Sequence, residues 1–97
     1  MYVVIFRAAT RSLDEQYYRT AARLRELALN EFGCIEFHAV TEGDAEVALS
    51  YWPTEEAIAA WKAHPEHLLA QEAGRERWYS WYSVEIACVA RSYRSPE

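Results

Sequence analysis

One segment of the chain gathers several side chains that can do chemistry. His67, Gln71 and Arg75 recur at intervals of four residues, so on a helix they form one stripe. A histidine titrates near neutral pH and can act as a base, and the planar guanidinium of arginine can hold an anion. We predict that His67 is a catalytic base and that Gln71 and Arg75 stabilise a substrate oxyanion. The alternative is a helix-end histidine paired with a carboxylate, beside a polar network at the surface or an interface.

Aromatic and charged residues elsewhere could complete a binding site. Trp61 could stack on a flat substrate as a pocket wall, or pack between helix and sheet as a core residue. Arg7 lies in an apolar run, so it must be paired or reach solvent, and it is a candidate contact for an anion. The other candidate substrate-binding residues, each with a core or interface role as its alternative, are His38, Tyr51, Trp52 and Trp78.

Metal ligands are not suggested by the spacing. His64 and His67 are three residues apart, but no further residue is placed to complete a set of ligands. Cys34 and Cys88 do not form a CxxC motif. We therefore expect no metal, and two buried free thiols in a reducing, cytoplasmic compartment.

Composition narrows the class of protein. The chain has 97 residues, 52% of them hydrophobic and 14% aromatic, which indicates one folded domain. A net charge of -5 without a basic cluster argues against nucleic acid and against an anionic membrane surface as partners. No apolar run reaches the roughly 18 residues that a membrane span needs. The first residues, MYVVIFRAATRSL, lack the basic start of a signal peptide.

The hydrophobic pattern predicts four strands and two helices. Strands are expected over 2–8, 34–43, 45–52 and 81–93, and helices over 13–32 and 54–79, the second broken at Pro65. Residues 93–97 should be a frayed tail. The order β-α-β-β-α-β is that of the ferredoxin-like α+β fold, a four-stranded antiparallel sheet with both helices on one face.

Capping and turn residues support these boundaries. Ser12 is the expected N-cap of the first helix, with Glu15 as its capping-box partner, and Gly33 should stop that helix. Thr54 is the expected N-cap of the second helix. Gly43 in TEGD should allow the hairpin turn between the middle strands.

The strands do not alternate cleanly between apolar and polar residues. The stretches 2–6, 47–49 and 86–90 are apolar on both sides, although helices can cover only one face of the sheet. A second copy of the chain is the simplest cover for the other face. We predict a homodimer whose sheets pack face to face, with a cavity for a small molecule between each sheet and its helices.

The second half of the chain resembles a known family. The segments SYW, AWK, HPEH, AQEAGRERWY and VARSY are similar to the pattern of the antibiotic biosynthesis monooxygenase (ABM) family, and the first half agrees in layout. The resemblance implies a dimeric α+β barrel. It also implies oxidation of a small planar phenolic, quinol or anthrone-like compound by O2, without metal or flavin. Such a protein needs a dry aromatic pocket, a base and a group that stabilises an anion.

The resemblance leaves two alternatives open. Some relatives degrade haem with a helix tryptophan, matched here by Trp61, and an iron-ligating histidine whose place is taken here by Gln71. Glutamine is a poor haem ligand, and Phe6 and Arg7 stand near the place of an asparagine of that group. His67, one turn from Gln71, could substitute as an altered iron ligand. The second alternative is a non-catalytic dimeric barrel that binds a small ligand.

Overall fold

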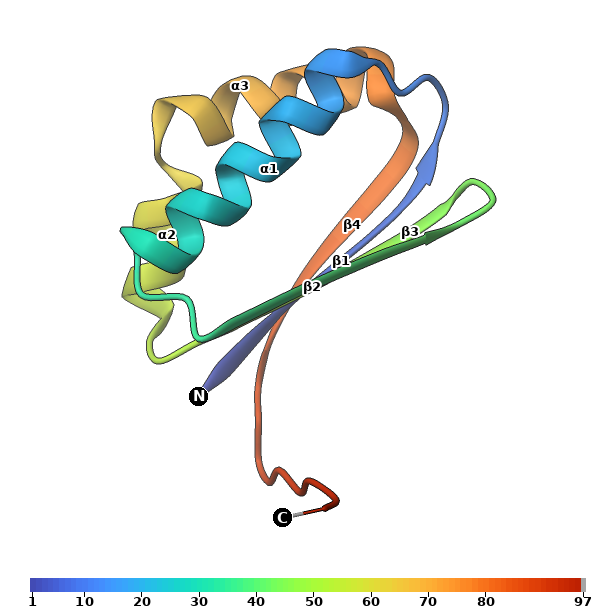
Figure 1. The fold of residues 1–97 in the computed structure, drawn as a ribbon. Helices are drawn as coiled ribbons and strands as arrows, with labels where there is room; N and C mark the ends of the chain where they lie inside the picture. The colour runs from blue at the N-terminus through green and yellow to red at the C-terminus, as the bar shows by residue number, and fades with distance from the viewer. Residues whose placement is uncertain (97) are drawn as a thin grey trace.

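The computed structural model describes residues 1–96 and confirms the predicted fold. Four strands form one antiparallel sheet in the order β2-β3-β1-β4, and the helices cover one face of it (Figure 1). The elements are β1 (Tyr2–Thr10), α1 (Glu15–Asn30), β2 (Glu36–Glu42), β3 (Ala45–Trp52), α2 (Glu55–Lys62), α3 (Pro65–Ala73), the π-helical turn η1 (Gly74–Trp78) and β4 (Tyr79–Cys88). Within residues 1–96, none of the helices has the length and apolar character that a membrane crossing requires.

The first helix begins later than predicted. Its N-cap is Asp14, whose Oδ1 accepts a hydrogen bond from the backbone N–H of Tyr17 at 2.8 Å. The prediction of Ser12 was wrong because Asp14 stands directly before the first helical residue and supplies the same kind of acceptor. The helix ends at Asn30, and Gly33 follows with a φ of 82° in the turn toward β2.

The other predicted caps and turns are confirmed. Thr54 caps α2 by accepting from the N–H of Ala57 at 3.1 Å. The helix breaks before Pro65, where the ring of His64 caps α3 by accepting from the N–H of Glu66 at 3.1 Å. Gly43 takes a φ of 61° in the hairpin.

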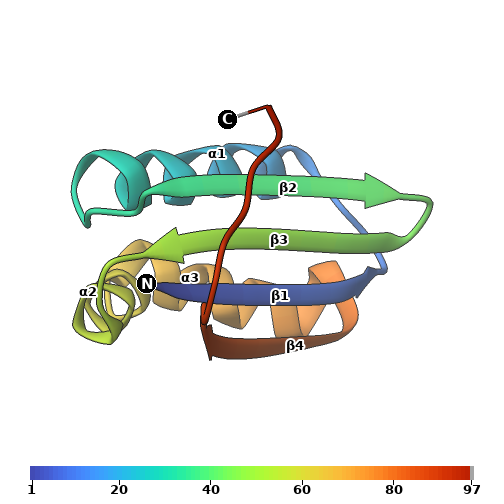
Figure 2. The same cartoon turned by 90° about the horizontal axis from the view of Figure 1, so that it is seen from below.

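The last strand is shorter than predicted at its far end. It runs from Tyr79 to Cys88, and the chain then leaves the sheet. The tail passes below the sheet, away from the helices, in Figure 1, and in front of the sheet in Figure 2. In this tail the Nη2 of Arg94 lies 3.4 Å from Oε1 of Glu36. Cys34 is buried, but Cys88 is exposed at the end of an edge strand, so its predicted burial was wrong. Residue 97 of the predicted frayed tail lies outside the described residues.

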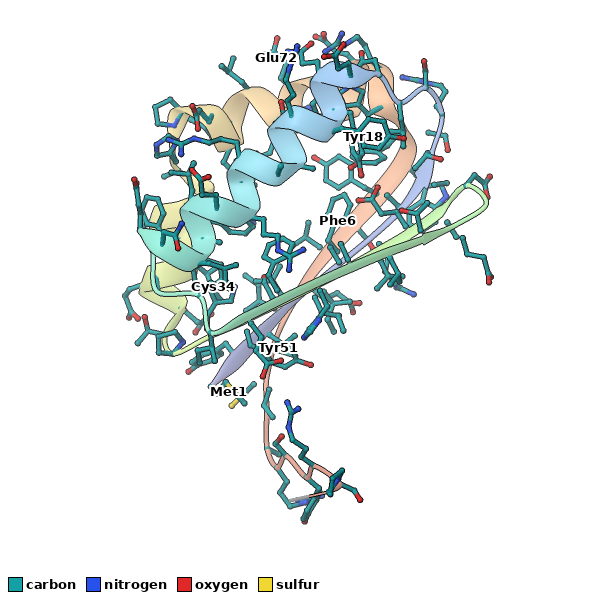
Figure 3. The ribbon with its side chains drawn as sticks, viewed as in Figure 1. Met1, Phe6, Tyr18, Cys34, Tyr51 and Glu72 are labelled. Carbon is teal, nitrogen blue, oxygen red and sulfur yellow. The ribbon has the colours of Figure 1, made fainter. Side chains whose placement is uncertain are left out.

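Strand register decides which side chains face the helices. Val4 pairs with Ser50 and Phe6 pairs with Ala48, and paired residues of antiparallel strands share a face. Phe6 points toward the helices in Figure 3, whereas Tyr51 points away from them. The sheet therefore has a helix-covered face and an open face.

A bulge changes the alternation at the start of β4. Ala9 pairs with Trp81, but Thr10 pairs with Tyr79, so Ser80 is an extra residue in the ladder. A bulge of this kind re-aims the side chains on one side of it. Tyr79 consequently joins Tyr82 on the helix-covered face instead of following Trp81 onto the open face.

The packed core occupies one end of the space between helices and sheet. Its buried members come from β1, α1, the loop before β2, β3 and α2: Val4, Leu27, Ala28, Cys34, Trp52, Ile58 and Trp61. Beyond Trp61 the space of the same layer is not filled, because several of the facing side chains are alanines.

Candidate functional site

A cavity of about 420 Å³ lies between the helices and the covered face of the sheet. Small side chains leave this room on α1, β2, β3 and α3, namely Ala21, Ala22, Ala39, Ala48 and Ala70. The walls are mainly apolar and aromatic, as in many small-molecule sites. The lining residues Ala22, Arg25 and Ala39 are exposed, so the cavity opens to solvent between α1 and β2.

Trp61 forms the boundary between the core and the cavity. Its indole Nε1 donates to the backbone oxygen of Leu24 on α1 at 3.0 Å. Its ring lies 5.1 Å from that of Trp52 on the core side and 4.4 Å from the edge-on ring of His67. These contacts fix the position of Trp61, which is both a core residue and a wall of the cavity.

His67 and Gln71 line the cavity as a hydrogen-bonded pair. The Nε2 of Gln71 lies 3.0 Å from Nδ1 of His67 and 3.5 Å from the backbone oxygen of Lys62. A backbone oxygen can only accept, so the amide nitrogen of Gln71 faces both partners and Nδ1 of His67 must also accept. The neutral ring therefore carries its hydrogen on Nε2.

His67 stays neutral over the physiological pH range. Burial lowers the pKa of His67 to about 4, and the positive charge of Lys62 contributes to the shift. Lys62 and Arg25 both line the cavity. Within residues 1–96 neither of these cations belongs to an ion pair.

A carboxylate that the sequence did not single out lies in the same cavity. Glu46 on β3 is only 7% exposed. The hydroxyl of Tyr17 on α1 donates to its Oε1, and the hydroxyl of Tyr79 on β4 donates to its Oε2 at 3.3 Å. Burial, together with the Glu46 charge, raises the pKa of both tyrosines above the usual range. Both phenols therefore remain protonated donors.

Trp78 closes the cavity beside Tyr17. The two rings are 5.4 Å apart in an edge-on arrangement, and Trp78 is buried at the end of η1. Gly74 permits this turn to pack closely, since a Cβ there would lie 3.1 Å from the ring of Tyr79. The indole Nε1 of Trp78 is buried without a hydrogen-bond partner among residues 1–96.

The structure brings together four of the predicted site residues. Trp61, His67, Gln71 and Trp78 all line the cavity. Arg75, the last residue of the predicted stripe, does not: it is exposed in η1, beyond the end of α3. The π-helical turn changes the helical period there, so the four-residue spacing no longer keeps Arg75 on the stripe.

The remaining predicted binding residues lie elsewhere. Trp52 is fully buried in the core, and its Nε1 donates to Oγ of Ser50 at 2.8 Å. Three others lie on the open face of the sheet: Arg7, His38 and Tyr51. Arg7 lies 3.6 Å from Glu85, and His38 lies 3.0 Å from Glu36. These positions assign them to the core or to the open face rather than to the cavity.

Comparison with known proteins places the chain in a family. The family model for antibiotic biosynthesis monooxygenase matches residues 1–73, which includes the first half of the chain and ends before η1. YqjZ of Bacillus subtilis is 38% identical over 91 residues, 93% of this chain and 80% of that protein. The jasmonate monooxygenase ABM of Pyricularia oryzae is 30% identical over 101 residues, covering 100% of this chain and 47% of that protein. The chain thus spans about half the length of the latter relative.

Solved structures agree on the fold. A variant of SnoaB, a cofactor-independent oxygenase from Streptomyces nogalater, aligns with a TM-score of 0.78 at 16% identity, over 99% of this chain and 97% of that one. Rv0793 from Mycobacterium tuberculosis aligns with a TM-score of 0.79 at 16% identity, over 96% of this chain and 98% of that one. These likenesses show the fold, and the match of the family model to residues 1–73 shows that the chain belongs to the antibiotic biosynthesis monooxygenase family.

Proposed function

We propose that the protein is a monooxygenase that oxidises a small planar phenol, quinol or anthrone-like compound with O2, without a metal or flavin. One observation carries the proposal. A single cavity combines aromatic walls, a neutral histidine and a buried carboxylate. These are the parts needed to bind a flat molecule, ionise it and hold the resulting anion away from water.

The chemistry relies on the substrate as the reductant. Loss of a proton leaves an electron-rich anion, which can pass an electron to O2. The protein then has to bind the substrate against Trp61 and stabilise the anion. Family membership and the likeness to SnoaB, a cofactor-independent oxygenase, support this reaction class.

The hydrogen-bond pattern suggests a donor role for His67 in place of the base role expected from sequence. Its Nδ1 accepts from Gln71 at 3.0 Å, which leaves Nε2–H as the group available to a ligand. We assign this N–H, with the charge of Lys62, to stabilisation of the substrate anion. Lys62 lines the cavity and takes the part first given to Arg75.

Oxygen uptake tests the proposal. The wild-type protein is mixed with quinols, anthrones and jasmonate, the last because one relative is a jasmonate monooxygenase, and uptake is recorded with and without a chelator. We expect chelator-insensitive uptake with at least one planar compound, and a rate about 100-fold lower in His67→Leu, which has no side-chain donor, typical of a lost oxyanion donor. His64→Asn is the matched control, since asparagine also caps a helix. Equal rates in the wild type and His67→Leu would contradict the role of His67.

We also propose that two copies pack through the open face of the sheet. This face carries Val3, Ile5, Val47 and Leu49 in adjacent strands. Further apolar side chains extend it at both edges, with Val40 67% exposed and Trp81 54% exposed. An exposed apolar patch bordered by polar residues, here the Arg7–Glu85 pair, is typical of an interface. A homodimer with a cavity in each subunit would be the working unit.

Haem fits these residues poorly. A histidine that ligates iron through one ring nitrogen normally donates from the other, whereas Nδ1 of His67 faces the amide N–H of Gln71. Titration with haemin tests this: we expect no saturable shift of the Soret band, and a shift at one haem per chain that is lost in His67→Ala would contradict the proposal.

The two free cysteines relate to the redox state of the compartment in which the protein works. Cys34 and Cys88 are both unpaired in the structure. We propose a reducing, cytoplasmic compartment, in which such thiols persist. Localisation of the tagged protein by cell fractionation tests this.

A further inference from the structure

We infer that Glu46 is the acceptor for the acidic hydrogen of the ligand, and that Tyr17 and Tyr79 hold its carboxylate in place for this task. The role of Glu46 as the base of an oxidation rests on the proposed function. The role of Glu46 as a hydrogen-bond acceptor for a bound hydroxyl does not depend on any reaction.

Glu46 is buried without a cation beside it in the described chain. A carboxylate removed from water is costly unless a cation or several donors compensate it. Within residues 1–96 no Lys, Arg or His forms an ion pair with Glu46, and its strand neighbour on the same face is Ala48. A few polar groups that converge on an otherwise apolar cavity, as Glu46 and its two phenols do, are typical of a ligand site.

Three separate elements place the carboxylate and its donors. Tyr17 comes from α1, Glu46 from β3, and Tyr79 reaches the cluster because the bulge at Ser80 turns it onto this face. Each carboxylate oxygen accepts one phenol, and a carboxylate offers about four acceptor positions. The unused positions are available to a ligand, since Glu46 lines the cavity.

His67 and the two tyrosines that contact Glu46 offer no anionic oxygen to a ligand. Nδ1 of His67 already accepts from Gln71, and its Nε2 carries a hydrogen. The two tyrosines stay protonated, because burial beside Glu46 raises the pKa of each phenol. Glu46 is thus the acceptor of choice for a ligand hydroxyl.

The proton transfer conserves charge in the cavity. The substrate O–H or C–H bond breaks, its electron pair stays on the substrate, and the proton bonds to a carboxylate oxygen of Glu46. The negative charge thereby moves from Glu46 to the substrate, and dioxygen is the electron acceptor for the following oxidation.

The two ends of the cavity carry side chains of opposite charge. Tyr17 and Arg25 are eight residues apart on α1, which corresponds to about 12 Å of helix rise. Glu46 lies at the Tyr17 end, whereas the Arg25 end is positive and includes a Phe37 ring 5.8 Å from the guanidinium carbon. The fitting ligand is therefore planar and carries a hydroxyl or similarly acidic group at one end and an anion or carbonyl at the other.

A matched pair of ligands tests the acceptor role. We would measure the dissociation constants of 2-naphthol and of its methyl ether, which lacks the hydrogen, by fluorescence for the wild type, Glu46→Gln and Glu72→Gln. Glu72 is exposed on α3 (Figure 3) and serves as control. We expect the wild type and the control to prefer naphthol about tenfold, as for a hydrogen bond to a charged group. Glu46→Gln should prefer it less, because an amide oxygen is a neutral and weaker acceptor. An unchanged preference in Glu46→Gln, or none in the wild type, would overturn the inference.

A second variant tests the acceptor role independently if Glu46→Gln does not fold. Tyr17→Phe leaves Glu46 with one donor fewer, so the ligand hydroxyl can take the vacated position and the preference for naphthol should rise. No rise would count against the acceptor role. If the preference follows these expectations but no oxygen is consumed with any compound, the proposed oxidation fails while the acceptor role of Glu46 stands.

Discussion

Tyr17 on α1 donates its phenol hydrogen to Glu46 on β3, across the space that separates the helices from the sheet. This contact joins the two layers at the end of the cavity away from the packed core. The rings of Tyr17 and Trp78 pack edge-on beside it, with centroids 5.4 Å apart. The cluster of Tyr17, Glu46 and Tyr79 is therefore both a structural support and the acidic end of the candidate site.

Removing the phenol of Tyr17 should destabilise the fold. Tyr17→Phe takes a donor from a buried carboxylate, so we expect the free energy of unfolding to fall by about 1–3 kcal/mol. Urea denaturation measures this, with Tyr18→Phe as control because Tyr18 is exposed. A midpoint for Tyr17→Phe equal to that of the control would show that this hydrogen bond contributes nothing.

The state of His67 should make stability depend on pH. Burial lowers its pKa from 6.5 to about 4 in the folded chain, so between these values the unfolded chain binds more protons. Stability should therefore be fully present above pH 6.5 and fall as the pH drops toward 4. We expect His67 to account for about 1–2 kcal/mol of this fall, discounted because its ring is only partly buried. Urea midpoints measured across this range should vary less in His67→Gln than in the wild type, and parallel curves would contradict the expectation.

A substitution that fills the cavity should stabilise the fold and at the same time prevent ligand binding. Ala48 lies on the cavity floor opposite Phe6, so Ala48→Leu would place apolar atoms in empty space and raise the unfolding free energy by about 0.5–2 kcal/mol. The same change should abolish binding of 2-naphthol. Ala59→Leu on the exposed surface of α2 is the control for both measurements. Full binding by Ala48→Leu would mean that the ligand lies elsewhere.

The proposed dimer should be sensitive to charge on the open face. Val40→Lys places a cation on that face, and we expect analytical ultracentrifugation to show dissociation at concentrations where the wild type is dimeric. Leu69→Lys is a close control, because Leu69 is 66% exposed and Val40 is 67% exposed, but Leu69 lies on α3 on the helical side. Loss of the dimer in both variants, or in neither, would count against the open face as the interface.

Much of the fold could be predicted because the strands and helices have distinct patterns. The helical spacing of α1, the TEGD turn and the break at Pro65 identify the elements and their order. His67 and Gln71 were found by the same reasoning, since four-residue spacing on one helix brings them together. The same reasoning was wrong for Arg75, because the α-helical spacing ends where α3 gives way to the π-helical turn η1.

Glu46 was missed in the sequence, and the place of Tyr79 in the cavity was not predicted, for different reasons. The alternation of β3 places Glu46 on the same side as Ala48, Ser50 and Trp52, so a charge on the core-facing side could have been noticed in the sequence. Tyr79 could not be placed in this way. Its side chain reaches the cavity only because of the bulge at Ser80, and the alternation of an unbroken strand would put it on the open face.

The most direct test is oxygen uptake by the wild type and by Ala48→Leu, each with a quinol and an anthrone under identical conditions. We expect uptake by the wild type to saturate with substrate. Ala48→Leu, although folded, should consume oxygen at least about tenfold more slowly, because its cavity no longer admits the ring. Uptake by Ala48→Leu at the wild-type rate, or uptake by the wild type no faster than in buffer, would contradict the claim that this cavity is the site of an oxidation.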